Sequence, residues 1–415
     1  MSVIRRALNY QESIDWLYGT QTFGIKLGLE NTGKLLAALG LMPDLEGRKI
    51  IHVAGTNGKG SVCAFSERIL RDGGLRTGLF TSPHLVTYRE RIRVRGTLIS
   101  EAAVAEILSR IRGLVFDWDF HPTFFEISLG LAMRYFCDQD CEVIVLETGM
   151  GGRLDATNAV KSDVSVITSI SLDHQQWLGE TIREIAGEKA GILKARVPVI
   201  VAELHPEARD VVGRCALTLG IPCIEVHPLP EEWELGLKGP HQRENAALAV
   251  EAACRIAGDR LTQDGIRRSL AETVWPGRFQ RIDDDLILDG AHNPGAASVL
   301  RETWQSTFPG EKARLVFGVV ESKDVGGIFE ALLPIIESVT FVAVKSERRL
   351  SINEMKAALI EAGGAGIPVT ESFSLPEAVA HSRQSGGKTL VAGSLFLVGE
   401  ALGHFLGETY EVSLQ

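Results

Sequence analysis

The stretch that decides the fold is residues 49–61, which read KIIHVAGTNGKGS. Its first six residues, Lys49–Ala54, form a short and mostly apolar run, the pattern of a strand that is buried on both faces. The glycine-rich residues 55–60 follow at once, and residues 60–72 predict a helix that closes at Gly73 and Gly74. A strand, a glycine-rich loop with a lysine and a helix, in this order, are typical of a phosphate-binding loop.

This loop departs from the common pattern GxxxxGK[ST] at one position. Gly60 stands where a hydroxyl residue usually holds magnesium, and Ser61 comes one residue late, so metal ligation must depend on other groups. Backbone N–H groups and the positive end of the helix favour phosphate oxygens, and Lys59 would reach the β- and γ-phosphates. The residues expected at ATP are Thr56, Asn57, Gly58, Lys59, Gly60 and Ser61.

Further apolar runs fall into two series, separated by helical segments such as residues 352–362. The first series comprises residues 77–80, 142–147, 163–170 and 198–202, and the second comprises residues 286–288, 314–319, 339–344 and 389–392. Continuous rather than alternating runs predict mostly parallel sheets of the α/β class. We therefore expect an N-terminal phosphate-loop domain over residues 1–276 and a smaller Rossmann-like domain over residues 277–415, with a Pro-Gly hinge at residues 275–278.

Composition excludes several classes of protein. The 415 residues carry 45% hydrophobic residues and a net charge of -10, which argues against non-specific nucleic-acid binding but allows a local phosphate site. Six cysteines lack CxxC or zinc spacing, so buried reduced thiols are expected. Neither a signal-peptide h-region nor an apolar run of membrane-spanning length is present, so we expect a cytoplasmic protein without membrane partners.

Three polar residues follow predicted strands and are candidate magnesium ligands. Glu147 ends the strand at residues 142–147 and precedes the glycine-rich TGMGGR, although an acid there could also be a surface or capping residue. His174 follows the run at residues 163–170, where a lone histidine is more often structural. Ser82 follows residues 77–80 and could either cap a turn before Pro83 or supply the hydroxyl that is missing at Gly60.

Two further segments remain open on spacing alone. Lys189 lies in a helix predicted from about Ile182, where a lysine is usually a solvated surface charge. Thr123 and Glu126 have capping-box spacing, which is a purely structural role. The intervening Phe124 and Phe125 could instead stack on a flat ring.

Nine ordered motifs resemble the folylpolyglutamate synthase and dihydrofolate synthase family, a branch of the Mur ligase-like amide synthases. The resemblance runs from about residue 25 to residue 400, and Gly60 is what this family carries. The motifs are HVAGTNGKGS (52–61), FTSPH (80–84), TFFE (123–126), LETGMGGRLDATN (146–158), SLDH (171–174), EKAGI (188–192), PGRF (276–279), LDGAHNP (288–294) and GSLFLVGE (393–400).

The resemblance implies an active site between the two domains. ATP would be completed by Asn245, Arg278 and Asp289, and two magnesium ions would be held, one by Ser82 and Glu147 and a second by His174. Lys189 is similar to a family lysine that CO2 carbamylates, which would make it a metal ligand. The residues implied in catalysis are Lys59, His174 and Lys189.

The resemblance also implies the substrates. The family's enzymes join L-glutamate to dihydropteroate or reduced folates through an acyl phosphate, and a monomer is expected. The pteroate-type substrate would meet Ile25, Lys26, Leu27, Thr123, Phe124, Phe125, Glu126, Leu154, Asp155 and Ala156, with His292 and Ser394 near nucleotide or glutamate. Alternatives are a polyglutamate synthase alone, another Mur-type ligase, or a nucleotide switch protein. The last would leave SLDH, EKAGI and the second domain unexplained.

Overall fold

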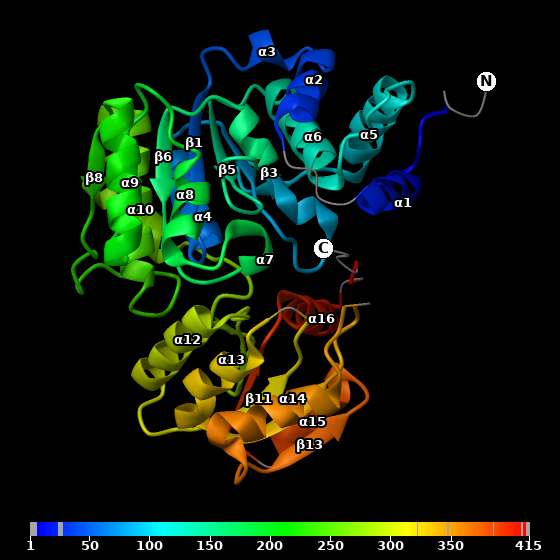
Figure 1. Ribbon diagram of the computed structural model, residues 1–415, viewed down its shortest axis with the longest axis vertical. Helices are drawn as coiled ribbons and strands as arrows, with labels where there is room; N and C mark the ends of the chain where they lie inside the picture. The colour runs from blue at the N-terminus through cyan, green and yellow to red at the C-terminus, as the bar shows by residue number, and fades with distance from the viewer. Residues whose placement is uncertain are drawn as a thin grey trace.

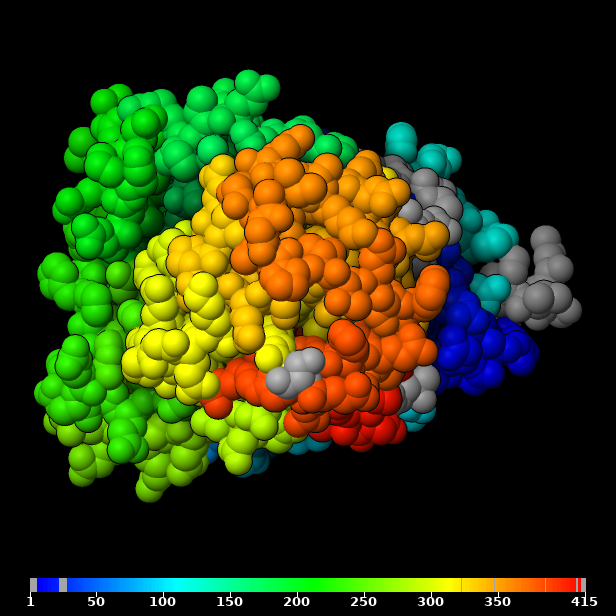
Figure 2. All heavy atoms as spheres, turned by 90° about the horizontal axis from the view of Figure 1, so that it is seen from below, coloured from blue at the N-terminus to red at the C-terminus, as the bar shows by residue number. Residues whose placement is uncertain are grey.

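The chain forms two α/β domains, one above the other in Figure 1, in a computed structural model of the protein. The structure describes residues 6–23, 28–321, 323–346, 348–384, 386–407 and 410–411. Seen from below, the second domain lies in front of the first, whose green and blue parts emerge on either side (Figure 2).

The first domain is built on an eight-stranded sheet of order β4-β3-β2-β5-β1-β6-β7-β8, in which only the β2–β3 and β3–β4 pairs are antiparallel. Its strands are β1 (Lys49–Ala54), β2 (Thr77–Phe80), β3 (Ile92–Val94), β4 (Thr97–Leu98), β5 (Val143–Glu147), β6 (Val164–Ile167), β7 (Val199–Val201) and β8 (Cys223–Glu225). Its helices are α1 (Tyr10–Gly19), η2 (Thr20–Phe23), α2 (Glu30–Ala38), α3 (Leu41–Asp44), α4 (Lys59–Asp72), η3 (Tyr88–Arg91), α5 (Glu101–Val115), α6 (Phe124–Asp138), η4 (Ala156–Ala159), α7 (Gln175–Leu178), α8 (Ile182–Ala190), α9 (Pro206–Leu219), α10 (Gln242–Ala257), η5 (Gly258–Arg260) and α11 (Gln263–Ala271).

The second domain has a six-stranded sheet of order β13-β12-β11-β14-β10-β9, parallel except for the β9–β10 pair. Its strands are β9 (Gln280–Arg281), β10 (Leu286–Leu288), β11 (Ala313–Phe317), β12 (Ile336–Val342), β13 (Val369–Ser372) and β14 (Lys388–Ala392). Its helices are α12 (Pro294–Thr307), α13 (Val325–Leu332), η6 (Leu333–Ile335), α14 (Ile352–Leu359), η7 (Ile360–Gly364), α15 (Leu375–Gln384) and α16 (Leu395–Leu406).

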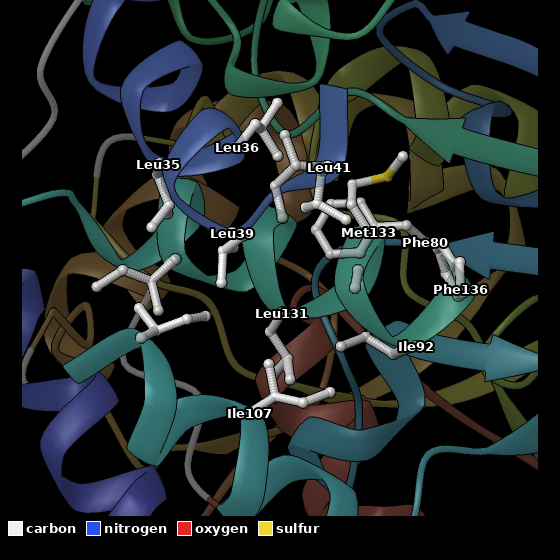
Figure 3. Close-up of a cluster of buried hydrophobic side chains, with 14 of the residues drawn as sticks. Leu35, Leu36, Leu39, Leu41, Phe80, Ile92, Ile107, Leu131, Met133 and Phe136 are labelled. Carbon is white, nitrogen blue, oxygen red and sulfur yellow. The ribbon is translucent and has the colours of Figure 1, made fainter. Parts of the chain in front are cut away.

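Both faces of the first sheet are buried, which explains its continuous apolar strands. Because successive side chains of a strand point to opposite faces, Val143 and Val145 of β5 join the core under α4 and α10, whereas Ile144 and Leu146 join the core under α2 and α6. Figure 3 shows the second of these cores, where leucines of α2 and α6 meet Phe80 of β2. The central strands are thereby held rigidly, and their carboxyl ends can carry a site.

The predicted strands are confirmed with shifts at their ends. Residues 163–170 were expected in one strand, but β6 stops at Ile167. The chain turns there because Thr168 Oγ1 donates to Asn57 O at 2.7 Å and Thr56 N donates to Ser169 O at 2.7 Å, so residues 168–169 support the phosphate loop instead.

The expectation of uniformly buried thiols is wrong for Cys223, which is exposed on the edge strand β8.

No helix within the described residues is long and apolar enough to cross a membrane.

Candidate active site

The phosphate loop runs from the end of β1 into α4, with glycines at its two tightest points. Gly58 has φ 87°, and a Cβ there would lie 2.5 Å from Asn245 Oδ1. A Cβ on Gly60 would lie 2.8 Å from Trp275 Nε1. The indole of the interdomain connection therefore covers the position at which other phosphate loops carry a hydroxyl.

Lys59 and Lys189 converge on one carbonyl of this loop. Lys59 Nζ donates to Gly55 O at 3.1 Å and to Thr56 O at 3.2 Å. Lys189 Nζ, from the last turn of α8, donates to the same Gly55 O at 2.8 Å. Two cations at the mouth of a glycine-rich loop make a local anion site in an acidic protein.

The pattern-based expectation that Lys189 is a surface charge is wrong, because its residue is only 4% exposed. Burial lowers the pKa of its amine to about 7, and the charge of nearby Lys59 acts in the same direction. The amine therefore loses its proton far more readily than a solvated lysine does.

Glu147 ends β5 beside β1, where Val53 is its register partner. Its carboxylate is buried. It accepts a hydrogen bond from the N–H group of Ser82, with an N···O distance of 3.0 Å. Burial raises the pKa of Glu147, and Lys59 opposes this rise. The sequence-predicted pair of Ser82 and Glu147 is thus brought together.

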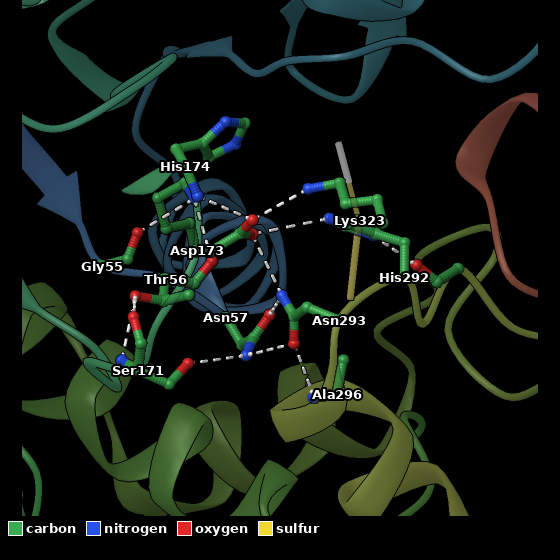
Figure 4. A network of polar contacts seen from close by, with 12 residues as sticks. Gly55, Thr56, Asn57, Ser171, Asp173, His174, His292, Asn293, Ala296 and Lys323 are labelled. Carbon is green, nitrogen blue, oxygen red and sulfur yellow. Dashed lines mark hydrogen bonds and ion pairs between the residues drawn. The ribbon is translucent and has the colours of Figure 1, made fainter. Parts of the chain in front are cut away.

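Asp173 connects the two domains (Figure 4). Its carboxylate accepts from Lys323 Nζ at 2.8 Å and from Asn293 Nδ2 at 3.1 Å, both in the second domain. Burial acts to raise the pKa of Asp173, but Lys323, His174 and His292 outweigh it and lower this pKa well below its usual range. The acid therefore stays ionised as an anchor for second-domain donors.

A second contact joins the phosphate loop to the other domain. Asn57 Nδ2 donates to Asn293 Oδ1 at 3.3 Å, and Asn293 Nδ2 donates back to Asn57 Oδ1 at 3.1 Å. Asn293 Oδ1 also accepts from Ala296 N at 2.8 Å and so caps α12. The start of α12 is thereby held against the loop.

His174 has a left-handed backbone, with φ 52°, and its side chain is open to the cavity between the domains. Partial loss of water lowers its pKa, and the cations Lys323, Lys59 and Lys189 add to this effect against the opposing charge of Asp173. The ring is neutral at physiological pH and can act as a ligand.

Arg278 precedes the first strand of the second sheet, β9, and Asp289 directly follows β10. Asp289 accepts from Phe279 N at 2.8 Å and from Ala291 N at 2.9 Å. Burial raises the pKa of Asp289, and Arg278 opposes it. Both residues line the same cavity as Asn245.

One cavity of about 1080 Å³ collects these groups between the domains. The predicted residues that line it are Thr56, Asn57, Gly58, Lys59, Gly60, Ser61, Ser82, Thr123, Phe124, Phe125, Glu126, Glu147, Leu154, Asp155, Ala156, His174, Lys189, Asn245, Arg278, Asp289, His292 and Ser394. A cavity with a phosphate loop, a buried acid, two lysines and aromatic walls can hold a nucleotide and a planar carboxylic acid together.

Comparison with known proteins agrees with this geometry. Residues 53–206 match the Mur ligase middle domain, and residues 277–395 match the Mur ligase glutamate ligase domain. The dihydrofolate synthase/folylpolyglutamate synthase of Bacillus subtilis is 35% identical over 80% of this chain and 85% of its own. The chain belongs to the dihydrofolate synthase/folylpolyglutamate synthase family.

Two further comparisons extend the likeness over nearly the whole chain. A probable bifunctional folylpolyglutamate synthase/dihydropteroate synthase of Halobacterium salinarum is 36% identical over 95% of this chain, which spans about half of that relative's length (51%). The structure of Escherichia coli FolC in complex with DHPP and ADP has a TM-score of 0.84 at 30% identity, covering 95% of this chain and 98% of that one.

The residues of the TFFE motif, 123–126, differ in how they face the cavity. Thr123 and Glu126 form the predicted capping box of α6, and Glu126 also accepts from Thr32 Oγ1 at 3.0 Å. Phe124 is buried and stacked on Tyr18, with ring centroids 5.4 Å apart, so only Phe125 has its ring partly open to the cavity. The capping role is confirmed, and Phe125 is the better placed of the two aromatics for stacking.

Asp155 is more constrained than expected of a substrate contact. Its Oδ2 accepts from Gly149 N and Met150 N, both at 2.9 Å, and its Oδ1 accepts from Thr157 N at 3.0 Å and from the Thr157 hydroxyl. These four donors use the acceptor capacity of the carboxylate, so Asp155 shapes the glycine-rich loop.

The last predicted residues of the second domain, His292 and Ser394, line the same cavity. His292 Nδ1 contacts Gly290 O at 2.8 Å, and its Nε2 lies 4.0 Å from Asp173. Ser394 caps α16 by accepting from Phe396 N at 3.2 Å. Ile25, Lys26 and Leu27 lie outside the described residues.

Sequence reasoning missed Lys323 and left Asn293 without a role. Lys323 lies shortly after β11, at the carboxyl edge of the second sheet, and this position is the signal that could have found it. Its partner Asp173 is 150 residues away in the chain, so spacing could not connect them.

Proposed function

We propose that this chain is an ATP-dependent ligase that adds L-glutamate to dihydropteroate and to reduced folates. The observation that carries the proposal is the interdomain cavity, which is lined by the phosphate loop, Ser82, Glu147, Lys189 and the aromatic Phe125. The DHPP and ADP named for the Escherichia coli neighbour support the same two classes of ligand here.

Amide formation from a carboxylate needs an activated acyl group, which ATP supplies by phosphorylating the acid. Both partners of that step are anions, so the site must neutralise charge before they meet. The positive charge at the cavity wall comes from Lys59, from Arg278 and from the N–H groups of residues 56–61. The glutamate amine then attacks the acyl phosphate, and phosphate leaves.

Water must be kept from the acyl phosphate, because hydrolysis would waste it. The Asn57–Asn293 and Asp173–Lys323 contacts close the cavity on the side of the phosphate loop. Motion at residues 275–278 would open and close this side, which makes the Pro-Gly connection the proposed hinge.

The expected magnesium ligands, Ser82, Glu147 and His174, supply only part of the coordination that two magnesium ions need. Within the described ranges no three His, Cys, Asp or Glu side chains gather into a metal cluster. Magnesium nevertheless often takes only one or two protein oxygens plus phosphate and water, and the carboxylate of Glu147 is buried and accepts from Ser82 N–H. Ser82 and Glu147 would hold the first ion and His174 the second, and the ions would supply charge neutralisation at the phosphates.

A carbamate on Lys189 would add the missing oxygen ligand for the second ion. The side chain of Lys189 is buried and its amine contacts Gly55 O, so an unmodified ammonium group at this position is poorly solvated. The ammonium of Lys189 would first lose one proton, and the neutral Nζ would then form a new N–C bond with carbon dioxide and lose a second proton, so that a buried cation becomes a carbamate anion.

Further parts of the proposal concern the whole molecule. We propose one domain over residues 1–276 and a second over residues 277–415, and the start of the glutamate ligase match at residue 277 supports this division. We propose a cytoplasmic monomer, since both faces of each sheet are covered within one chain.

Coupled ADP release tests this function, with ATP, magnesium and L-glutamate present and dihydropteroate or tetrahydrofolate as the acceptor. Release with both acceptors, and products heavier by one glutamate residue, is the expected result. Release with tetrahydrofolate alone would narrow the proposed function to that of a polyglutamate synthase. Release with neither, from folded protein that binds ATP, would reject the folate proposal and favour another Mur-type ligase.

A further inference from the structure

Two residues of the first domain are packed in the core of the second. Leu85 and Val86 follow the FTSPH motif, and they belong to an apolar cluster with side chains of β10, β11, β12, β14, α15 and α16. Both side chains are buried. The backbone that carries Ser82 is therefore anchored in the other domain only three residues downstream.

Helix α16 makes room for this backbone with a glycine. A Cβ on Gly399 would lie 2.0 Å from Leu85 O, closer than any side chain could tolerate. A Cβ on Gly277, in the connection between the domains, would lie 3.1 Å from Leu85 Cδ1. Leu85 thus sits beside the covalent link of the two domains.

Glu411 holds the same backbone from the C-terminal side. Its N–H donates to Val86 O at 2.8 Å. Its carboxylate accepts from Tyr88 N at 2.7 Å and from the hydroxyl of Tyr10 at 3.0 Å. Glu411 is therefore bonded to the first domain through both its main chain and its side chain.

A second carboxylate completes the arrangement from within the first domain. Glu90 accepts from Leu85 N at 3.0 Å, from Val86 N at 2.7 Å and from Thr87 N at 2.8 Å. Together Glu90 and Glu411 accept from four consecutive backbone N–H groups, and the fourth, that of Tyr88, donates to Glu411.

We infer that Glu411 is a positioning residue, which clasps the backbone of residues 86–88 and thereby holds the Ser82 loop in place against the second domain. Two features connect the clasp to the site: Ser82 N–H donates to Glu147 at 3.0 Å, and Tyr410 lines the active-site cavity. This edge of the domain interface combines the apolar packing of Leu85 and Val86 with hydrogen bonds to the backbone, whereas the edge at Asp173 and Asn57 is held by polar side chains alone among the contacts described above. The cleft would then open by rotation about the clasped edge.

Hydrogen exchange of the wild-type protein and of Glu411→Ala tests the clasp directly, without reference to activity. A charge-assisted hydrogen bond is lost at Tyr88, so we expect its amide to exchange about tenfold faster or more. Glu411→Gln retains one acceptor oxygen and should restore part of the protection. Glu330→Ala is the matched control, because Glu330 is an exposed acid of α13 in the same domain.

Ligation kinetics test the consequence for the site, which rests on the proposed function. Glu411→Ala should raise the KM for ATP several-fold with a smaller change in kcat, and Glu411→Gln should lie between it and the wild type. Tyr10→Phe should change the KM for ATP less in the Glu411→Ala background than in the wild type, since the hydrogen bond between Tyr10 and Glu411 is already gone there.

Unchanged exchange at residues 86–88 in folded Glu411→Ala would overturn the clasp. Exchange that rises equally in Glu330→Ala would also overturn it, because the effect would then be general destabilisation. A wild-type chain that ligates no glutamate, but shows the expected exchange pattern, would reject the proposed function and leave the clasp supported.

Discussion

Lys189 Nζ lies 2.8 Å from the carbonyl oxygen of Gly55, so the last turn of α8 is bonded to the first residue of the phosphate loop. Lys59 Nζ approaches the same oxygen at 3.1 Å. Two ammonium groups on one carbonyl repel each other, and the buried one is the less well solvated. A negative group on Lys189 would turn this repulsion into attraction.

Replacing Lys189 tests that idea. We expect Lys189→Ala to lose about 100-fold or more in kcat, since a group close to the developing charge would be missing. Lys189→Arg should fail equally, because a guanidinium cannot be carbamylated. Intact-protein mass spectrometry under CO2 should show one added CO2 on the wild type and none on either variant. Full activity of Lys189→Arg would contradict the carbamate.

Lys59→Ala should abolish turnover without unfolding the protein. Lys59 is only partly buried and bonds to carbonyls of its own loop, so its removal leaves the core intact. We expect a loss of about 100-fold or more in kcat, with an unchanged circular dichroism spectrum. Lys161→Ala removes an exposed lysine and serves as the control. Near-normal turnover of Lys59→Ala would reject the phosphate-loop assignment.

The Asp173–Lys323 pair should couple the domains energetically. Both side chains are nearly buried, at 10% and 11% exposure, so either one left alone is a poorly solvated charge. In a double-mutant cycle of Asp173→Asn and Lys323→Met, we expect a coupling free energy of about 1–3 kcal/mol from thermal or urea unfolding. Strictly additive effects would show that the pair contributes nothing to the interface.

Gly399→Ala should disturb the contact between the domains. The added methyl would lie 2.0 Å from Leu85 O, and overpacking of this kind costs about 1–3 kcal/mol of unfolding free energy. The matched control is Gly113→Ala in α5, where nothing lies within 4 Å of the added Cβ. There the better helix propensity of alanine should stabilise by about 0.5–1 kcal/mol. Equal responses at both sites would refute the close approach.

Lys194 should make stability depend on pH in the alkaline range. Burial lowers the pKa of its amine from 10.5 to about 8. The folded state thus binds fewer protons than the unfolded state between these values, so stability rises as pH increases from about 8 to 10.5. Below pH 8 the charged form is held in the folded protein at a cost in free energy.

Comparison with Lys194→Met isolates this effect from other titrating groups. The melting temperature of the variant should exceed that of the wild type most below pH 8, and the difference should shrink towards pH 10.5. Lys194 Nζ also donates to Asn158 Oδ1 at 2.6 Å, so the variant loses one hydrogen bond at every pH. A difference that stays constant with pH would contradict the lowered pKa.

The sequence alone was sufficient for the parts of this protein that depend on neighbouring residues. β1, β2 and β10 have the predicted bounds, and α4 begins one residue earlier than expected, at Lys59. Continuous apolar runs and a Gly-Lys loop act locally, because burial of alternate side chains and the left-handed turn at Gly58 are properties of a few consecutive residues.

The cavity itself was decided by tertiary structure. Spacing predicted Lys189 as a surface charge, yet the contact with Gly55 O, 134 residues away, buries it. Asn57 and Asn293 are separated by 236 residues, and Asp173 and Lys323 by 150. Such contacts depend on how the two sheets dock rather than on any local pattern. A lysine in a helix has the same local sequence whether its side chain is exposed to solvent or buried in the wall of a cavity. The sequence therefore determined the strands, the phosphate loop and the family, whereas only the docking of the domains determined which charges meet.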